Sequence, residues 1–254
     1  NFDLIGPIAT QGIGGQVVRY ANTASMKSQG QELSIQTTNI RNRDFTWITN
    51  LIYSHVTTKV TSLMSQARTI DLISGEASSG FTMKGYPHRA IFSMPFKGLT
   101  DKGIPTYLNE KNELTSTDLD FQNRIDNSYL IYEGPTEPTI TGSLGNELKW
   151  KNWRLNVFVT YSFGSYVRLD PVFSARYNDL TSMTKEFKNR WVQAGDELTT
   201  NVPGILPYRS FASNRRLRIA YNAYNYTSNR TAKGDFVRMK EISLGYDLPK
   251  SLLQ

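Results

Sequence analysis

The stretch "NWRLNVFVTYSF", residues 152–163, alternates between polar and apolar side chains along almost its whole length. Polar side chains fill the positions between the apolar ones, and only Phe158 breaks the pattern. Successive side chains of a strand point to opposite faces, so the stretch predicts a β-strand with one apolar and one polar face. The apolar side chains are Trp153, Leu155, Val157, Val159, Tyr161 and Phe163. This face has to contact either a protein core or lipid.

The length of this strand favours lipid over a protein core. Trp153 and Phe163 are ten positions apart, which corresponds to about 33 Å along a strand. A tilt of about 40° reduces this to roughly 25 Å, the height of the apolar band of a transmembrane barrel. Core strands of soluble sandwiches usually end after about five or six residues. Two aromatic girdles are expected at the rims of such a band, and we assign to them Trp150, Trp153, Tyr161 and Phe163.

The same alternation continues in other segments of the chain. It is found in residues 32–40, 44–56, 139–150 and 236–248, and we predict a further strand at residues 89–99. The side chains predicted to face lipid are Leu144, Leu155, Val157, Val159, Ile242 and Leu244. Residues 1–30 are rich in Gly, Ala, Ser and Thr, and they predict loop with short extended pieces.

Short and long connections alternate between these segments. Short turns are predicted at 41–43, 100–103 and 149–152, and long loops at 61–87, 110–136 and 164–235. Outer-membrane barrels have short periplasmic turns and long extracellular loops. We therefore interpret residues 1–254 as part of a single all-β, antiparallel transmembrane β-barrel domain. One short helix is predicted in the longest loop, over residues 182–195, where Met183, Phe187 and Trp191 form an apolar stripe.

Composition excludes several other kinds of protein. The chain has 254 residues and a mean hydropathy of -0.44, and it lacks the run of about 18 apolar residues that a transmembrane helix needs. It has no cysteine, so disulfides and thiolate metal sites are excluded. The net charge is +7, but no nucleic-acid-binding motif accompanies it. We interpret the charge as a solvated basic surface and predict no nucleic-acid partner.

No catalytic or metal-binding pattern is present in the sequence. The only histidines, His55 and His88, lie on separate segments, and neither has a carboxylate at helical spacing. The carboxylate pairs Asp118/Asp120 and Glu133/Glu137 have no histidine beside them. We therefore predict that the protein is not an enzyme and that it binds no cofactor or metal.

Several segments, taken in order, match one known pattern. Residues 234–249, "GDFVRMKEISLGYDLP", follow G-x-F-x-R-h-K-x-h-x-L-G-Y-x-L-P, where h is hydrophobic. Residues 134–164 fit the hairpin before it, and "NRWVQAGDE" (189–197) fits R-W-x-x-x-G-D-E. Residues 27–55 fit a K-G-x-E-h-x-h strand and a D-F-x-W-x-x-N strand, except that Ser28 and Gln29 separate Lys27 from Gly30. These segments resemble the C-terminal part of SusC/RagA-type TonB-linked outer-membrane transporters.

The resemblance implies active import of a nutrient across the outer membrane of a Bacteroidetes-type bacterium. In that family a large barrel surrounds an N-terminal plug, TonB acts on the plug, and a SusD-like lipoprotein covers the extracellular mouth. The cargo is an oligosaccharide, or a peptide in some branches. The chain matches neither the plug nor the last strand or strands of the pattern. We therefore expect the remaining barrel and plug segments, as well as membrane lipid, to be its partners.

Aromatic side chains of the long loops are candidates for contacts with cargo or with the lipoprotein. Flat rings next to Asn and Arg suit stacking on sugars and hydrogen bonding to hydroxyl groups. The candidates are Trp191, Tyr208, Arg218, Tyr221, Tyr224 and Tyr226. The alternative for each of them is packing within its own loop.

Two alternatives of other kinds remain open at this point. The first is a soluble all-β carbohydrate-binding module, in which the apolar faces pair in a sandwich. The second is a small self-closed barrel that acts as a porin or adhesin. A second layer of the same chain packed on Leu155, Val157 and Val159 would favour the sandwich.

Overall fold

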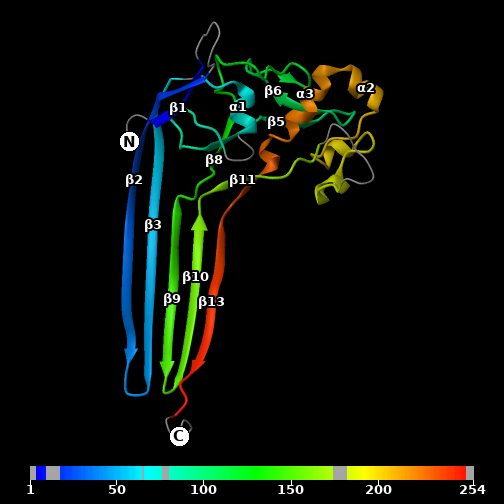
Figure 1. The fold of residues 1–254 in the computed structure, drawn as a ribbon. Coiled ribbons are helices and arrows are strands. Elements are labelled where there is room, and N and C mark those ends of the chain that lie inside the picture. The colour runs from blue at the N-terminus through cyan, green and yellow to red at the C-terminus, as the bar shows by residue number, and fades with distance from the viewer. Residues whose placement is uncertain (1–3, 10–17, 65, 76–79, 174–181, 250–254) are drawn as a thin grey trace. The chain divides into compact units, whose positions relative to one another are not determined.

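The computed structural model describes residues 4–9, 18–64, 66–75, 80–173 and 182–249 (Figure 1). Contacts between residues divide the chain into two compact units. The sheet unit consists of residues 27–58, 137–165 and 233–254, and the packed unit of residues 1–26, 59–136 and 166–232.

The long strands all belong to one six-stranded sheet with the order β1-β2-β3-β9-β10-β13. β1 pairs with β2, β3 with β9, and β10 with both β9 and β13, each time antiparallel. The strands are β1 (Leu4–Ala9), β2 (Val18–Arg41), β3 (Phe45–Leu63), β9 (Ile140–Trp150), β10 (Trp153–Phe163) and β13 (Phe236–Tyr246). The predicted antiparallel all-β class is confirmed, and the described strands form an open sheet with β1 and β13 at its edges.

Tight turns join the strands at one end of the sheet unit. Asn42 Oδ1 accepts the backbone N–H of Asp44 (3.1 Å) and of Phe45 (2.8 Å), which closes the β2–β3 turn. Lys151 takes a positive φ of 52° in the β9–β10 turn, and its N–H donates to the Asp44 carbonyl (2.7 Å). Asp247, just after β13, donates to the carbonyl of Asn152 (2.9 Å). We call residues 42–44, 151–152 and 247 together the turn edge.

The other elements are short. The strands are β4 (Ala90–Ser93), β5 (Phe96–Leu99), β6 (Pro105–Leu108), β7 (Leu114–Thr115), β8 (Ile131–Pro135), β11 (Tyr166–Arg168) and β12 (Thr231–Lys233). The helices are α1 (Thr69–Ser74), α2 (Tyr208–Ser213) and α3 (Arg215–Tyr224), with 3-10 helices η1 (Lys185–Asn189), η2 (Asp196–Leu198) and η3 (Ser228–Arg230). β4 pairs with β8, β11 with β12, and β5, β6 and β7 form a three-stranded sheet. The main core cluster of the packed unit is built around Leu72, Phe92, Tyr107 and Ala220.

Two strand predictions differ from the structure. Residues 89–99 divide into β4 and β5, which belong to the small sheets. Every side chain of β4 is buried, so its apolar run is continuous and carries no alternation that would identify a membrane strand. The turn predicted at 100–103 joins β5 to β6 inside the packed unit. Residues 18–30, predicted as loop, form the first half of β2; residues 10–17 of that prediction lie outside the described residues.

The helix predicted over residues 182–195 was also wrong. Only the 3-10 helix η1 forms there, because Arg190 takes an extended conformation (ψ 152°) and the Trp191 N–H donates to the Val202 carbonyl (2.9 Å). Tertiary contacts thus outweigh the helical pattern. The longest described helix is instead α3, where Asn214 caps the start by accepting the N–H of Leu217 (3.1 Å).

Candidate functional site

The register of β3, β9, β10 and β13 gathers alternating apolar side chains on one face, here called the apolar face. Directly paired residues of neighbouring strands lie on the same face. The row nearest the turn edge is Phe45, Trp150, Trp153 and Tyr246, followed by Trp47, Leu148, Leu155 and Leu244. The next rows are Thr49, Asn146, Val157 and Ile242, then Leu51, Leu144, Val159 and Met239, then Tyr53, Gly142, Tyr161 and Val237. Aromatic rings therefore lie near both ends of the face, with mostly aliphatic rows between them.

Aromatic side chains contact one another at both ends of the apolar face. The rings of Trp153 and Tyr246 have centroids 4.7 Å apart, and those of Tyr161 and Phe163 are stacked at 5.6 Å. Rings at two levels with aliphatic side chains between them are typical of a surface that crosses a bilayer.

The apolar face is largely uncovered in the described structure. Trp150 is 56% exposed, Ile242 64% and Leu244 67%. Within the described residues, none of the three buried hydrophobic clusters contains a side chain of this face. An apolar surface of this extent is typical of a membrane or protein contact.

The opposite face of the same strands is polar. Its rows include Glu147, Asn156 and Ser243, and Ser143, Thr160 and Arg238. Phe158, the exception to the alternation, lies on this face beside Gly145, where the absent side chain leaves room for its ring. A bulge in β13 follows immediately, since Phe158 pairs with Glu241 and Val159 with Met239.

A chain of polar side chains crosses the apolar face, and the sequence reasoning did not find it. Asn146 Oδ1 accepts from Trp47 Nε1 (2.9 Å) and from Thr49 Oγ1 (2.8 Å). Asn39 Nδ2 donates to Thr49 Oγ1 (2.6 Å), and Thr37 Oγ1 donates to Asn39 Oδ1 (2.9 Å). The available signal was that Thr49 and Asn146 stand at apolar-face positions of the alternation. Because each polar group bonds to the next, the chain is compatible with apolar surroundings.

Gly142 provides a close approach between strands that we expect to be sensitive to substitution. A Cβ there would overlap the Tyr161 hydroxyl and the Ile52 carbonyl, which are bonded to each other at 2.9 Å. Gly142→Val is expected to lower the free energy of unfolding of the intact protein by about 1–3 kcal/mol, measured by urea denaturation. Gly145→Ala is the matched control, because its Cβ would lie 3.4 Å from Phe158, an ordinary contact. Equal losses for both variants would contradict this role of Gly142.

In the packed unit, two of the candidate contact residues are core residues. Tyr221 and Tyr224 are each 2% exposed. The ring of Tyr221 contacts Phe173 (centroids 5.2 Å apart), and that of Tyr224 contacts Phe96 (5.5 Å). Burial raises the pKa of Tyr224 to about 12. Stacking on a cargo molecule is thus not available to these two rings, because α3 turns both of them into the core.

The other candidate residues lie closer to the surface. Trp191 is half-buried and donates from Nε1 to Glu197 Oε2 (3.0 Å). Tyr226 is half-buried against the main core cluster, and Arg218 donates to the Ala212 carbonyl. The side chain of Tyr208 lies outside the described residues. Trp191, Tyr226 and Arg218 do not form a common cavity in the described structure, so their contact with cargo stays a prediction.

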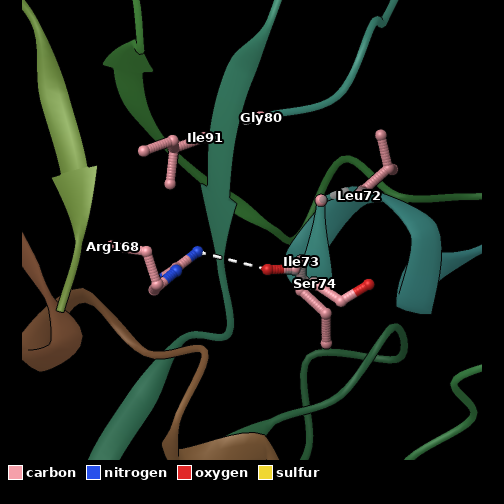
Figure 2. A pocket seen from close by; sticks show the side chains of 7 residues that line it. Leu72, Ile73, Ser74, Gly80, Ile91 and Arg168 are labelled. Atoms are coloured by element: carbon pink, nitrogen blue, oxygen red, sulfur yellow. Dashed lines mark hydrogen bonds between the residues drawn. The ribbon is translucent and has the colours of Figure 1, made fainter. Parts of the chain in front are cut away.

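Arg168, which the sequence reasoning did not single out, joins separate segments of the packed unit (Figure 2). Its guanidinium donates to the carbonyls of Phe92 (2.7 Å), Thr227 (3.1 Å) and Ile73 (3.3 Å), and to Ser93 Oγ (2.9 Å). Burial lowers the pKa of Arg168 to about 10, so the side chain stays charged near neutral pH. The cavity beside it measures only about 10 Å³, about the volume of one water. Arg168 therefore has a structural role.

Arg230 forms a second such contact. It is 3% exposed, its Nη1 lies 3.2 Å from Glu186 Oε2, and it also donates to the Asp170 carbonyl. Burial alone would raise the pKa of Glu186, but the guanidinium of Arg230 lowers it below its ordinary value. The ion pair holds η1 against η3.

Two searches of the described residues gave no further site. No group of three or more His, Asp or Glu side chains is arranged to hold a metal ion there. No helix in that part of the chain is long and apolar enough to cross a membrane.

Comparison with known proteins gives relatives of one kind. No model of a protein family matches the chain. TonB-dependent receptor P3 of Formosa agariphila is 26% identical over 268 residues, which cover 99% of this chain and 24% of that protein. TonB-dependent receptor P39 of the same organism is 24% identical over 264 residues, which cover 89% of this chain and 24% of that protein.

Solved structures with the same fold come from a peptide transporter. The RagAB peptide transporter matches with a TM-score of 0.68 and 19% identity, over 99% of this chain and 26% of that chain. The RagAB peptide importer in its open-open state matches with a TM-score of 0.69 and 19% identity, over 100% of this chain and 26% of that chain. The chain thus spans about a quarter of the length of the proteins that it matches. It is a relative of the SusC/RagA-type TonB-dependent transporters and has the fold of one segment of such a protein.

Proposed function

We propose that the whole protein imports a nutrient across the bacterial outer membrane in a TonB-dependent manner, and that this chain supplies part of its barrel wall and loops. The observation that carries the proposal is the uncovered apolar face, bounded by aromatic side chains at both ends. Its proposed lipid contacts are Leu144, Leu155, Val157, Val159, Ile242 and Leu244, and the polar face would line a water-filled interior. The chain is then part of one barrel domain, and it transports cargo without chemical change.

The edges of the sheet point to further strands. Within the described residues, the outer edge of β13 and the part of β2 beyond β1 have no neighbouring strand. Unpaired N–H and C=O groups inside a bilayer cost several kcal/mol each. We therefore propose that both edges pair with other barrel segments of the same transporter.

The cargo and the partners are proposed from the relatives. The receptors that resemble the chain are TonB-dependent by name, and RagAB is a peptide transporter. We propose an oligosaccharide or a peptide as cargo, TonB as the energy-coupling partner, and a SusD-like lipoprotein over the mouth. Trp191, Arg218 and Tyr226 are the candidates for contact with cargo or lipoprotein.

Uptake by cells that produce the intact transporter tests this function. Accumulation of fluorescent oligosaccharides or peptides is expected to stop when the gene is deleted, and also when a protonophore collapses the proton gradient that drives TonB. Uptake that continues with the protonophore would favour the porin alternative. A folded monomer that purifies without detergent would favour the soluble binding module.

A further inference from the structure

The apolar face has a hollow next to the turn edge. It has a volume of about 360 Å³ and is lined by Phe45, Leu148, Trp150, Trp153, Leu155 and Leu244. Its lining comes from β3, β9, β10 and β13, and it belongs to the two rows nearest the tight turns. Its volume lies within the range of about 300–1,000 Å³ that is usual for sites of small ligands. Since every lining side chain is apolar, the hollow suits a hydrocarbon chain.

Positive charge lies beside this hollow. Lys151, at the turn edge, has its Nζ 5.7 Å from the centroid of the Trp150 ring, which lines the hollow. Arg43 stands in the β2–β3 turn. Arg41 is two residues beyond Asn39, so it lies on the same face as the polar chain. All three cations are exposed, and in the described part of the chain none of them forms an ion pair.

The nearby acidic groups are fewer. Asp247 is paired with Arg154, which belongs to the polar face. Asp44 is the other carboxylate of the turn edge. Three cations thus stand against one unpaired carboxylate at the rim of an apolar hollow. This combination fits an amphiphile with a negatively charged head and a hydrocarbon tail.

We propose that the hollow binds one membrane phospholipid with an anionic headgroup. Its acyl chain would occupy the space between Trp150, Trp153 and Leu244, and its phosphate would be held by Arg41, Arg43 and Lys151. The proposal rests on the proposed function, in which the apolar face lies in the bilayer. Aromatic rings hold this level of the membrane, and basic side chains next to them select negative headgroups.

Photolabelling of the intact transporter tests the site. Two probes carry the same diazirine acyl chain, one on phosphatidylglycerol and one on phosphatidylcholine, and mass spectrometry maps the labelled peptides. We expect residues 45, 148–155 and 244 to be labelled more strongly by the anionic probe. Each cation near an anionic headgroup contributes about fivefold in affinity, so the combined variant Arg41→Gln, Arg43→Gln, Lys151→Gln is expected to abolish the preference.

Two further variants make the test specific. Lys149→Gln removes a cation beside Trp150 on the opposite face, and it is expected to leave the preference unchanged. Leu155→Trp fills the hollow and is expected to lower labelling by both probes. Equal labelling by both probes in the unmodified protein would overturn the lipid site while leaving the transporter function standing. No labelling of these residues by either probe would contradict the lipid-facing position, and with it the proposed function.

Discussion

Replacing Val157 by arginine is expected to destabilise the membrane-inserted transporter by about 2–4 kcal/mol. Val157 pairs with Asn146 on one side and Ile242 on the other, between the two aromatic ends of the apolar face. A guanidinium at this level would therefore lie deep in the hydrocarbon. Urea unfolding of the intact protein in lipid vesicles measures the change in the free energy of unfolding.

Two companion variants separate lipid from a protein core. Asn156→Arg, on the polar face, is expected to change stability by no more than about 0.5 kcal/mol. Val157→Phe is expected to be equally mild, because lipid chains adapt to a larger side chain. A packed protein core would not adapt, and overpacking costs about 1–3 kcal/mol. A loss of that size for Val157→Phe would show that a second protein layer covers this face.

Replacing Arg168 by methionine is expected to have the second large effect, a loss of about 3 kcal/mol or more in the packed unit. Hydrogen bonds to a charged group contribute about 1.5–3 kcal/mol each, and their removal leaves buried carbonyls unsatisfied. Arg168 donates to carbonyls of α1, β4 and the segment before η3 at once. Hydrogen exchange of the amides in α1 and β4 of the intact protein measures the loss.

Arg168→Lys is the matched control for this prediction. Lysine keeps the positive charge, but its single ammonium group cannot reach carbonyls in several directions as the guanidinium does. We expect it to restore only part of the protection. If lysine protects the amides of α1 and β4 as well as arginine does, charge alone would explain the role of Arg168, and the multiple bonds would not be needed.

The sheet unit was predictable from the sequence because each strand has one apolar and one polar face. That requirement fixes a period of two, which can be read in residues 139–163 and 236–248 without knowledge of the partners. The positions of the tight turns follow from the same pattern. The register then brings Phe45, Trp150, Trp153 and Tyr246 into one row.

The packed unit was not predictable in this way. Its strands are short, and β4 is buried throughout, so alternation gives no signal. Tyr221 and Tyr224 looked like surface rings because they lie among Asn and Arg in the sequence, yet α3 buries both. Arg168 was missed for a related reason, since its partners come from three segments that only the tertiary fold brings together.

The chain of side-chain bonds through Asn146 has a consequence for how the strands find one another. A slip of β9 by two residues against β3 would keep every outward side chain outward, so hydrophobicity alone would not penalise the error. The slip would, however, separate Asn146 from Trp47 and Thr49. In hydrocarbon each abandoned polar group costs several kcal/mol. A mispaired intermediate would thus be rejected when it enters the bilayer, and correct assembly would depend on proofreading by the membrane itself.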